Sequence, residues 1–513
     1  MPSSDIQNNA PASELSSPAP EPRTGGKIKW WLLGIGILVM VLLRNQPWDC
    51  LIGYDQAKQA FVSLEMQQEG RWWYQHLPTG YPATKPPLAG WLSAAFYPLL
   101  GGWWEGAWRA PSLLAFMGIL WILGKTAWGI GREWGAFLAL AFFSINMLTI
   151  RIATLVRTDM LLALTILLGG LMIWRQIRED QPWSLSRRMT FALIVLAGCF
   201  TKGPVIVVYL LLPLLTWRIM CWRRREPSQA WPGWWPWLVP IGVFALWLAI
   251  GCIKDHQFFR MVVLKEFGTN FAAISVADSG DVTFGSRRFG MMLTYPLQLL
   301  HRLFPWSLAM VIWALVDRQG RRRLLSDPGA RWLVVWIGVA LLLMSLVPNK
   351  RVDRIFPIVA PLALLGAYGV AAGTWREGRR WSPHRVIGGL TLVSFLIWGG
   401  YTIYWQLDRH NPEKNEELAR RELCRQVSRY ARATQRNIRI AGPVSDLNQS
   451  LMTTLRCTKP VAKDKLDDEL HNRSYILMPL PPEGRTNDAW RVVFWADHVK
   501  EKNCSYALLI GSR

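Results

Sequence analysis

Residues 27–43 read KIKWWLLGIGILVMVLL, and this stretch decides the class of the protein. Lys27 and Lys29 precede an apolar run, Trp30–Leu43, that approaches the length of a bilayer span. Because basic residues accumulate on the cytoplasmic side of a span, we interpret the run as a retained first helix with its N-terminus inside. Residues 1–26 are rich in Ser, Pro and Glu, and are predicted to be a disordered cytoplasmic tail.

Comparable apolar runs recur along most of the chain, which is 51% hydrophobic and contains 31 Trp. Trp enrichment is typical of the aromatic belts at membrane interfaces. Threaded alternately across a bilayer, the runs predict a polytopic α-helical membrane protein with about eleven spans. The runs after the first are Ala110–Gly124, Trp134–Ile150, Met160–Trp174, Met189–Thr201, Gly203–Trp217, Trp231–Ile253, Leu303–Val316, Trp332–Asn349, Ile355–Trp375 and Val386–Gln406.

The formal net charge of +23 fits this threading. All but one of the dense basic clusters fall in loops assigned to the inside, as the positive-inside bias predicts, so we do not assign the charge to nucleic-acid binding. One step stays open: residues 189–217 form either one long helix or a hairpin. We prefer the hairpin, because Gly203-Pro204 breaks the helix after Lys202.

The threading leaves three long segments outside. Residues 44–109 are long enough for short interfacial helices, and residues 254–302 are a candidate lid over a site. Residues 408–513 are predicted to be a small periplasmic α/β domain, with helices over 416–432 and 446–455 and strands over 437–444, 491–495 and 506–510. A disulfide among Cys424, Cys457 and Cys504 is left open.

The first outer segment carries the residues best suited to chemistry. It begins with Tyr54-Asp55-Gln56 and later reads Thr84-Lys85-Pro86-Pro87. A carboxylate can accept a proton from a hydroxyl or hold a divalent metal, although Asp55 is also a natural helix cap. Pro86-Pro87 restrict the backbone next to Lys85 and so fix the direction of its side chain. An ammonium group held in this way is suited to bind a phosphate oxygen.

Further charged residues lie near span ends on the same predicted face. Ionisable groups are costly at membrane depth, which favours a functional role, but snorkelling and helix capping explain many of them equally well. Asp159 is the second candidate carboxylate, and Lys350-Arg351 with Arg354 is the candidate phosphate-binding cluster. The other members of this set are Lys58, Arg109, Arg157 and Lys202.

At these residues the chain resembles the GT-C glycosyltransferases that use polyprenyl-phosphate sugars, which include the lipid A aminoarabinose transferase and the protein O-mannosyltransferases. The matching pieces occur in family order over about residues 30–370. They are Asp55 with Ala57 and Glu65-Met66, Lys85-Pro86-Pro87-Leu88 with Trp91, Arg109-Ala110-Pro111-Ser112, Arg157-Thr158-Asp159, Lys202-Gly203-Pro204, Phe304-Pro305-Trp306, and Lys350-Arg351 with Phe356-Pro357.

The resemblance implies a GT-C-like bundle over residues 27–407 in a bacterial-type inner membrane, with its site and the C-terminal domain on the periplasmic side. It implies that Asp55 and Asp159 are catalytic and that Lys85, Lys350 and Arg351 contact the donor phosphate, a role we extend to Lys202 and Arg354. Donor or acceptor contacts are expected from Tyr54, Lys58, Arg109 and Arg157. The expected partners are membrane lipids, a polyprenyl-phosphate sugar, and a lipid, glycan or protein acceptor.

Two departures from the family pattern bear on metal binding. The family often has a glutamate where this chain has Gln56, and another where it has Thr84. Each departure removes a carboxylate that could help hold a divalent cation, so a metal, with Asp55 as its candidate ligand, is left open. Two other classes also stay open: a lipid-linked sugar flippase or transporter, and a membrane anchor for the C-terminal domain.

Overall fold

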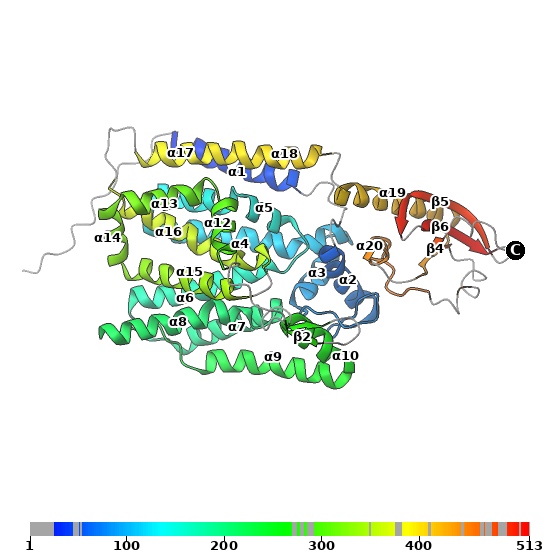
Figure 1. The fold of residues 1–513 in the computed structure, drawn as a ribbon, viewed down its shortest axis with the longest axis horizontal. Helices are drawn as coiled ribbons and strands as arrows, with labels where there is room; N and C mark the ends of the chain where they lie inside the picture. The colour runs from blue at the N-terminus through cyan, green and yellow to red at the C-terminus, as the bar shows by residue number, and fades with distance from the viewer. Residues whose placement is uncertain are drawn as a thin grey trace, which may run out of the picture.

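The computed structural model describes residues 25–44, 51, 54–268, 274–276, 282–284, 292–347, 350–374, 382–408, 412–442, 446–461, 466, 475–480, 490–501 and 504–511. These residues form a bundle of long helices with a small sheet domain at one end (Figure 1). Of the predicted tail, residues 1–24 lie outside the described residues, and Gly25 already begins the first helix.

Seven of the described helices are long and apolar enough to cross a membrane, or eight if the bent pair α12–α13 is one span. The chain is therefore a multi-pass membrane protein, although the predicted number of eleven spans is not confirmed. The helices of the bundle are α1 (Gly25–Arg44), α4 (Trp104–Ser144), α5 (Met147–Thr154), α6 (Asp159–Glu179), α7 (Leu185–Lys202), α8 (Val205–Arg224), α9 (Trp235–Lys254), α12 (Thr294–Arg302), α13 (Trp306–Val316), α14 (Arg318–Ser326), α15 (Pro328–Leu346), η3 (Val352–Ile358), α16 (Val359–Ala372), α17 (Pro383–Ser394), η4 (Phe395–Gly399) and α18 (Gly400–Leu407).

The helix α4 folds back on itself, which partly explains the different count. Its backbone leaves the helical conformation at Gly131 and Arg132, where Arg132 has a φ of 52°. Across the fold, a Cβ on Gly135 would lie 3.3 Å from the carbonyl oxygen of Ala127, so the two arms pack closely. Two predicted runs, Ala110–Gly124 and the first part of Trp134–Ile150, therefore lie in one continuous element.

The predicted hairpin at Gly203-Pro204 is present: α7 ends at Lys202 and α8 begins at Val205. Gly203 has a φ of 78° and a ψ of −166°, a conformation that is essentially restricted to glycine. The far ends of these helices meet other turns of the bundle, since Arg187 donates to Gln176 at 2.8 Å and Arg331 pairs with Glu226 at 3.3 Å. Among the described residues, the basic turns after α6, after α8 and before α15 therefore gather at one end.

Tryptophan packing holds the bundle core together. Trp332 and Trp336 of α15 are fully buried, and the indole nitrogen of Trp332 donates to the carbonyl oxygen of Gly170 at 3.2 Å. A Cβ on Gly170 would lie 2.0 Å from the Trp336 ring, so α6 and α15 can approach this closely only with glycine at that position.

In residues 44–109, where short interfacial helices are predicted, the structure has α2 (Tyr54–Glu69) and α3 (Leu88–Leu99); their place at a membrane interface stays a prediction. Residues 254–302 hold a short helix, a π-helix, a small antiparallel hairpin and α12. The elements before α12 are α10 (His256–Phe258), η1 (Phe259–Gly268), β1 (Ile274–Val276) and β2 (Val282–Phe284). Residues 269–273, 277–281 and 285–291 lie outside the described residues, so the lid role stays a prediction.

The C-terminal domain is a four-stranded sheet with two helices; the sequence predicts both helices and three of the four strands. The strand order is β3-β4-β6-β5, with β3 and β4 parallel and the other pairs antiparallel. The elements are α19 (Pro412–Thr434), β3 (Ile438–Ile440), α20 (Asp446–Leu455), β4 (Tyr475–Leu480), β5 (Trp490–Glu501) and β6 (Cys504–Gly511). Cys424 and Cys457 are both buried and free, and the side chain of Cys504 lies outside the described residues.

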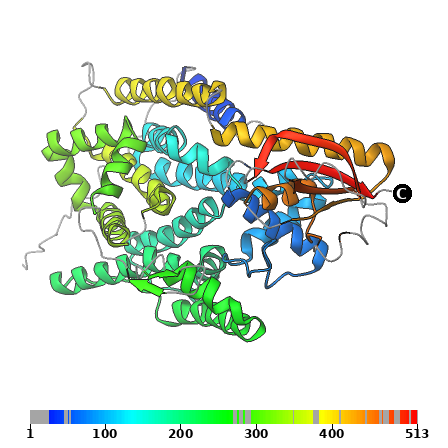
Figure 2. The ribbon, with the colours of Figure 1, turned by 45° about the vertical axis from the view of Figure 1, so that its right-hand side comes forward.

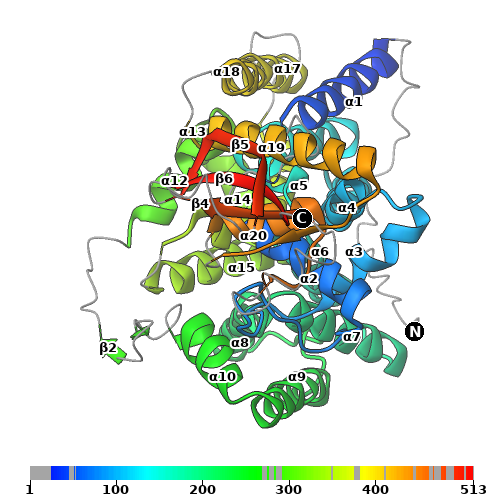
Figure 3. The ribbon, with the colours of Figure 1, turned by 90° about the vertical axis from the view of Figure 1, so that its right-hand side faces the viewer.

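This domain docks on α2, the helix that begins beside Asp55. Phe61 of α2 is buried in the core of the C-terminal domain. Glu69, at the end of α2, accepts a hydrogen bond from Thr458 at 2.8 Å and pairs with Lys459 at 2.6 Å. Helix α20 packs directly on α2, and Figure 2 shows the C-terminal domain at the same end of the molecule as the blue helices α2 and α3; Figure 3 views the molecule from that end. The docking places the domain at the same end of the bundle as Asp55.

Candidate active site

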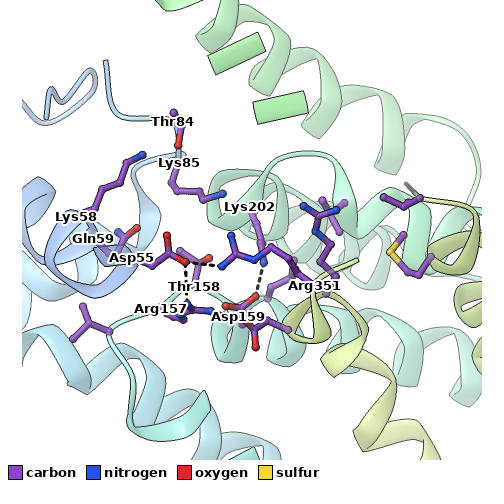
Figure 4. Close-up of a pocket in the computed structure, with 17 residues that line it drawn as sticks. Asp55, Lys58, Gln59, Thr84, Lys85, Arg157, Thr158, Asp159, Lys202 and Arg351 are labelled. Carbon is purple, nitrogen blue, oxygen red and sulfur yellow. Dashed lines mark hydrogen bonds and ion pairs between the residues drawn. The ribbon is translucent and has the colours of Figure 1, made fainter. Parts of the chain in front are cut away.

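The ends of several helices meet around one polar cavity of about 290 Å³. Asp55 comes from the start of α2, Asp159 from the start of α6, Lys202 from the end of α7, and Val205 from the start of α8 (Figure 4). The lining residues are Asp55, Lys58, Gln59, Thr84, Lys85, Val156, Arg157, Thr158, Asp159, Leu162, Lys202, Val205, Met344, Val347, Arg351, Asp353 and Arg354.

Asp55 lies between two guanidinium groups. Arg157 Nη2 donates to Asp55 Oδ2 at 2.9 Å, and Arg351 Nη2 donates to the same oxygen at 2.6 Å. Burial alone would raise the pKa of Asp55, but the hydrogen bond from Arg351 and the charges of Arg157, Arg351 and Lys85 together outweigh it and hold the pKa below its usual value. The carboxyl group is therefore ionised at neutral pH.

Arg157 connects Asp55 to a second carboxylate, Asp353, which accepts from its other terminal nitrogen. The loop that carries Arg157 is fixed from both sides. Ser112 donates to the carbonyl oxygen of Arg157 at 3.0 Å, and the side-chain oxygen of Gln56 accepts from the backbone N–H of Val156 at 3.0 Å. The position of Arg157 is thus set by α2 and α4 together.

Asp159 forms the second charged pair of the site. Its carboxylate, which is 6% exposed, accepts from the ammonium group of Lys202, a contact that joins the start of α6 to the end of α7. Burying this carboxylate would be costly without such a partner. The pair therefore keeps both charges at the wall of the cavity, next to the Gly203 break.

The lining of the cavity is electropositive. It holds six basic side chains and three carboxylates, so positive charge is in excess by three. The N-termini of α2, α6 and α8 reach the same wall, and helix N-termini carry partial positive charge with N–H groups that favour anions. Lys85 extends toward this region just before Pro86-Pro87, as Figure 4 shows. The cavity suits a phosphate group.

Most of the predicted site residues meet here, but of those whose side chains are described, Lys350 and Arg109 do not line the cavity. Lys350 donates to the carbonyl oxygen of Ser345, and its ammonium lies 5.0 Å from the Tyr295 ring centroid, so it closes the C-terminal end of α15. Arg109 is buried within α4, where it donates to the Glu105 carbonyl at 3.1 Å. The side chain of Tyr54 lies outside the described residues.

Asp353, Gln59 and Thr158 also line the cavity, although they were not predicted as site residues. Asp353 had a visible signal, since it is the one acid in the basic run 350–354. Its role became evident only from the pairing with Arg157. Within the described residues there is no group of three or more His, Cys, Asp or Glu that could hold a metal ion.

Comparison with known proteins bears on the fold. No family model and no curated protein sequence matches the chain. The crystal structure of ArnT from Cupriavidus metallidurans bound to undecaprenyl phosphate matches with a TM-score of 0.62 at 15% sequence identity, over 95% of this chain and 99% of that one. Its apo form gives a TM-score of 0.60 over 95% and 100%. The chain has the GT-C fold of ArnT.

This finding confirms the predicted GT-C-like helical fold with a small C-terminal sheet domain, because nearly the whole of both chains is covered, but it does not confirm the number of eleven spans. The archaeal oligosaccharyltransferase AglB from Archaeoglobus fulgidus, in complex with an inhibitory peptide and a dolichol-phosphate, also matches, with a TM-score of 0.41 at 12% identity over 88% of this chain and 69% of that one.

Proposed function

We propose that this chain is an integral-membrane glycosyltransferase that moves a sugar from a polyprenyl-phosphate donor to a hydroxyl acceptor. The observation that carries the proposal is the cavity at the helix ends, where an ionised carboxylate, Asp55, stands within a lining that has three positive charges in excess. The ArnT structure with the same fold was solved with undecaprenyl phosphate bound, which supports a lipid phosphate as the donor group.

The basic wall would hold the donor phosphate. Arg351 is the best placed group, because its side chain is 48% exposed, so a phosphate can reach its guanidinium group. A guanidinium binds phosphate oxygens in the same bidentate manner as carboxylate. With Lys85 beside it, Arg351 would stabilise the charge that grows on the phosphate as the glycosidic bond breaks. Lys202 supports this wall through Asp159.

Asp55 would orient the acceptor hydroxyl on the opposite side of the sugar. Both arginines bind its Oδ2, so within the described residues Oδ1 is the oxygen turned to a substrate. A carboxylate with a lowered pKa is a weak base, but the donor phosphate already is a good leaving group and little proton transfer is needed early. If Arg351 binds the donor phosphate, it no longer pairs with Asp55. The pKa of Asp55 would then rise, and the carboxylate would accept the proton of the acceptor hydroxyl more readily. Direct displacement with inversion follows.

The proposal includes the side of the membrane and the acceptor. Because the basic turns lie at the end opposite the cavity, the cavity and the C-terminal domain would face the periplasm of a bacterial inner membrane. The acceptor is then a hydroxyl of a lipid A-like lipid, a surface glycan or a protein, the last as in a protein O-mannosyltransferase. We propose that the basic side chains of the lining stabilise the charge on the donor phosphate, which is the role that a divalent metal ion would otherwise have.

The test is turnover of a radiolabelled polyprenyl-phosphate sugar in membranes, for wild type, Asp55→Asn and Lys85→Ala, with and without a chelator. Matched controls are Asp180→Asn and Lys125→Ala, which change the same groups outside the cavity lining. We expect Asp55→Asn to lower turnover at least about a hundredfold and Lys85→Ala mainly to raise KM for the donor. Equal activity in all variants would refute the assigned site.

Two outcomes would transfer the proposal to another class. If the labelled lipid crosses the membrane without loss of its sugar, the chain is a transporter. If wild type neither transfers nor moves any of several donor sugars, while the C-terminal domain retains a binding partner, the anchor hypothesis is favoured.

Loss of turnover on chelation would show that a metal acts in the site after all.

A further inference from the structure

A second group of basic side chains lies outside the cavity, where the end of α1 meets α5, α12 and α18. Arg44 is the last residue of α1, Arg151 belongs to α5 and Arg302 is the last residue of α12. Figures 1 and 3 show α1 beside the α17–α18 rod. The side chain of Gln406 in α18 donates to the carbonyl oxygen of Leu43, which fixes this contact.

Arg44 is an unusual residue in this place. The residue is only 7% exposed, and its guanidinium lies over the Trp405 ring, with 4.4 Å between the guanidinium carbon and the ring centroid. The Nη1 atom is buried and has no hydrogen-bond partner within the described residues. A buried, unpaired donor of this kind costs free energy and calls for a ligand.

The three arginines act on one another. Arg151 lies within electrostatic range of both Arg44 and Arg302, and Tyr401 is a neighbour of the same two. Arg302 donates to the neutral groups Gln298, at 3.3 Å, and Met147, at 3.1 Å. Within the part of the chain that the structure describes, none of the three forms an ion pair with a carboxylate. Like charges gathered without a directly paired carboxylate repel one another, so an anion from outside would stabilise the group.

The surroundings indicate what kind of anion fits. Leu43, Tyr404 and Leu407 are exposed beside the group, at 39%, 65% and 71%, so the rim offers a largely apolar surface that suits lipid chains. Trp405 and Tyr401 are the aromatic residues typical of the membrane interface. Guanidinium groups bind phosphate oxygens in pairs. From these contacts we infer that Arg44, Arg151 and Arg302 form a binding site for the phosphate of an anionic lipid, beside α1 and α18.

The site is distinct from the cavity but close to it. Asp353, which pairs with Arg157 in the cavity wall, also lies within electrostatic range of Arg302. A lipid phosphate held at the three arginines would therefore act electrostatically on this wall, with its chains against α1 and α18. The inference does not depend on the proposed reaction, because it concerns binding alone.

The experiment counts bound lipids by native mass spectrometry of the purified full chain, titrated with phosphatidylglycerol, phosphatidylcholine or undecaprenyl phosphate. The test variants are Arg151→Gln and Arg302→Gln, both half-buried, which we expect to fold. The control is Arg322→Gln, which removes the same charge from the exposed face of α14. We expect wild type to retain one more phosphatidylglycerol than phosphatidylcholine, and each test variant to bind phosphatidylglycerol about tenfold more weakly.

Unchanged phosphatidylglycerol binding in both test variants would overturn the inference, and so would an equal loss in Arg322→Gln. Undecaprenyl phosphate separates the two sources of lipid phosphate. If it displaces phosphatidylglycerol even in Lys85→Ala, the site takes the polyprenyl phosphate; if it does not, the site takes a membrane phospholipid. The experiment measures lipid binding and not turnover. Its result can therefore be interpreted even if the proposed glycosyltransferase reaction is refuted.

Discussion

Replacing Arg157 with glutamine tests the architecture of the site most directly. The Arg157 side chain is 16% exposed and contacts both Asp353, 13% exposed, and Asp55. Arg157→Gln therefore leaves a largely buried carboxylate without its partner. Removing one member of a fully buried ion pair costs about 3–5 kcal/mol, mostly because the remaining charge stays desolvated.

Two features of this site reduce the loss of stability expected for Arg157→Gln. Arg302 and Arg351 also lie within electrostatic range of Asp353 and keep part of its stabilisation. Asp55 is 42% exposed, so its pairing with Arg157 is screened by solvent and contributes no more than about 1 kcal/mol. We therefore expect Arg157→Gln to lower the free energy of unfolding by about 3 kcal/mol.

The assay is a double-mutant cycle with Asp353→Asn, read from unfolding titrations in mixed micelles. Because each single change breaks the same pair, the double variant should lose about 1.5 kcal/mol less than the sum of the single losses. Arg175→Gln is the control: it breaks an exposed pair with Glu179 at 2.6 Å and should cost less than about 0.5 kcal/mol. Additive losses in the cycle would refute the pairing of Arg157 with Asp353.

Three further predictions follow from single contacts. Burial raises the pKa of Glu65 to about 7 from its ordinary 4.5, so the folded carboxyl holds its proton more tightly than the unfolded chain. Stability should then fall as pH rises between these values, and Glu65→Gln should flatten that slope in thermal unfolding. Arg351→Gln should raise KM for the donor about tenfold or more, whereas Lys350→Met should lower stability and leave that KM nearly unchanged. Gly203→Ala should cost about 1–3 kcal/mol in unfolding titrations, and Gly242→Ala, in an open and ordinary helical position, should be nearly neutral.

The helices and their breaks were the part of the fold most open to prediction. Long apolar runs, and Gly203-Pro204 between two of them, are local signals, and the helix predicted over residues 446–455 matches α20. Strand β4 was missed. Its sequence, YILMPL, is apolar throughout and has Pro479 inside, so it shows neither the alternation nor the composition of an ordinary strand. It is recognisable only once β3 and β6 pair with it on either side.

Within the site, residue types were predictable and directions were not. The run Lys350-Arg351-Val352-Asp353-Arg354 reads as one basic cluster. The short helix η3, which begins at Val352, separates the side chains: Asp353 reaches Arg157, Arg351 reaches Asp55, and Lys350 turns back to the end of α15. A sequence gives the order of such residues but not the rotation of the turn that carries them.

The two departures from the family pattern turn out to be unequal in what they imply for a metal. Gln56 is buried, does not line the cavity, and uses its side-chain oxygen to hold the Val156 N–H, so a glutamate there would keep the same contact and stay out of the cavity. Thr84 does line the cavity, beside Lys85. We therefore expect Thr84→Glu to weaken donor binding, because it lowers the positive excess around the phosphate, whereas Gln56→Glu should leave donor KM within about threefold. If Gln56→Glu instead changed donor KM more than Thr84→Glu, position 56 would have to face the substrate, and the arrangement of α2 described here would be wrong.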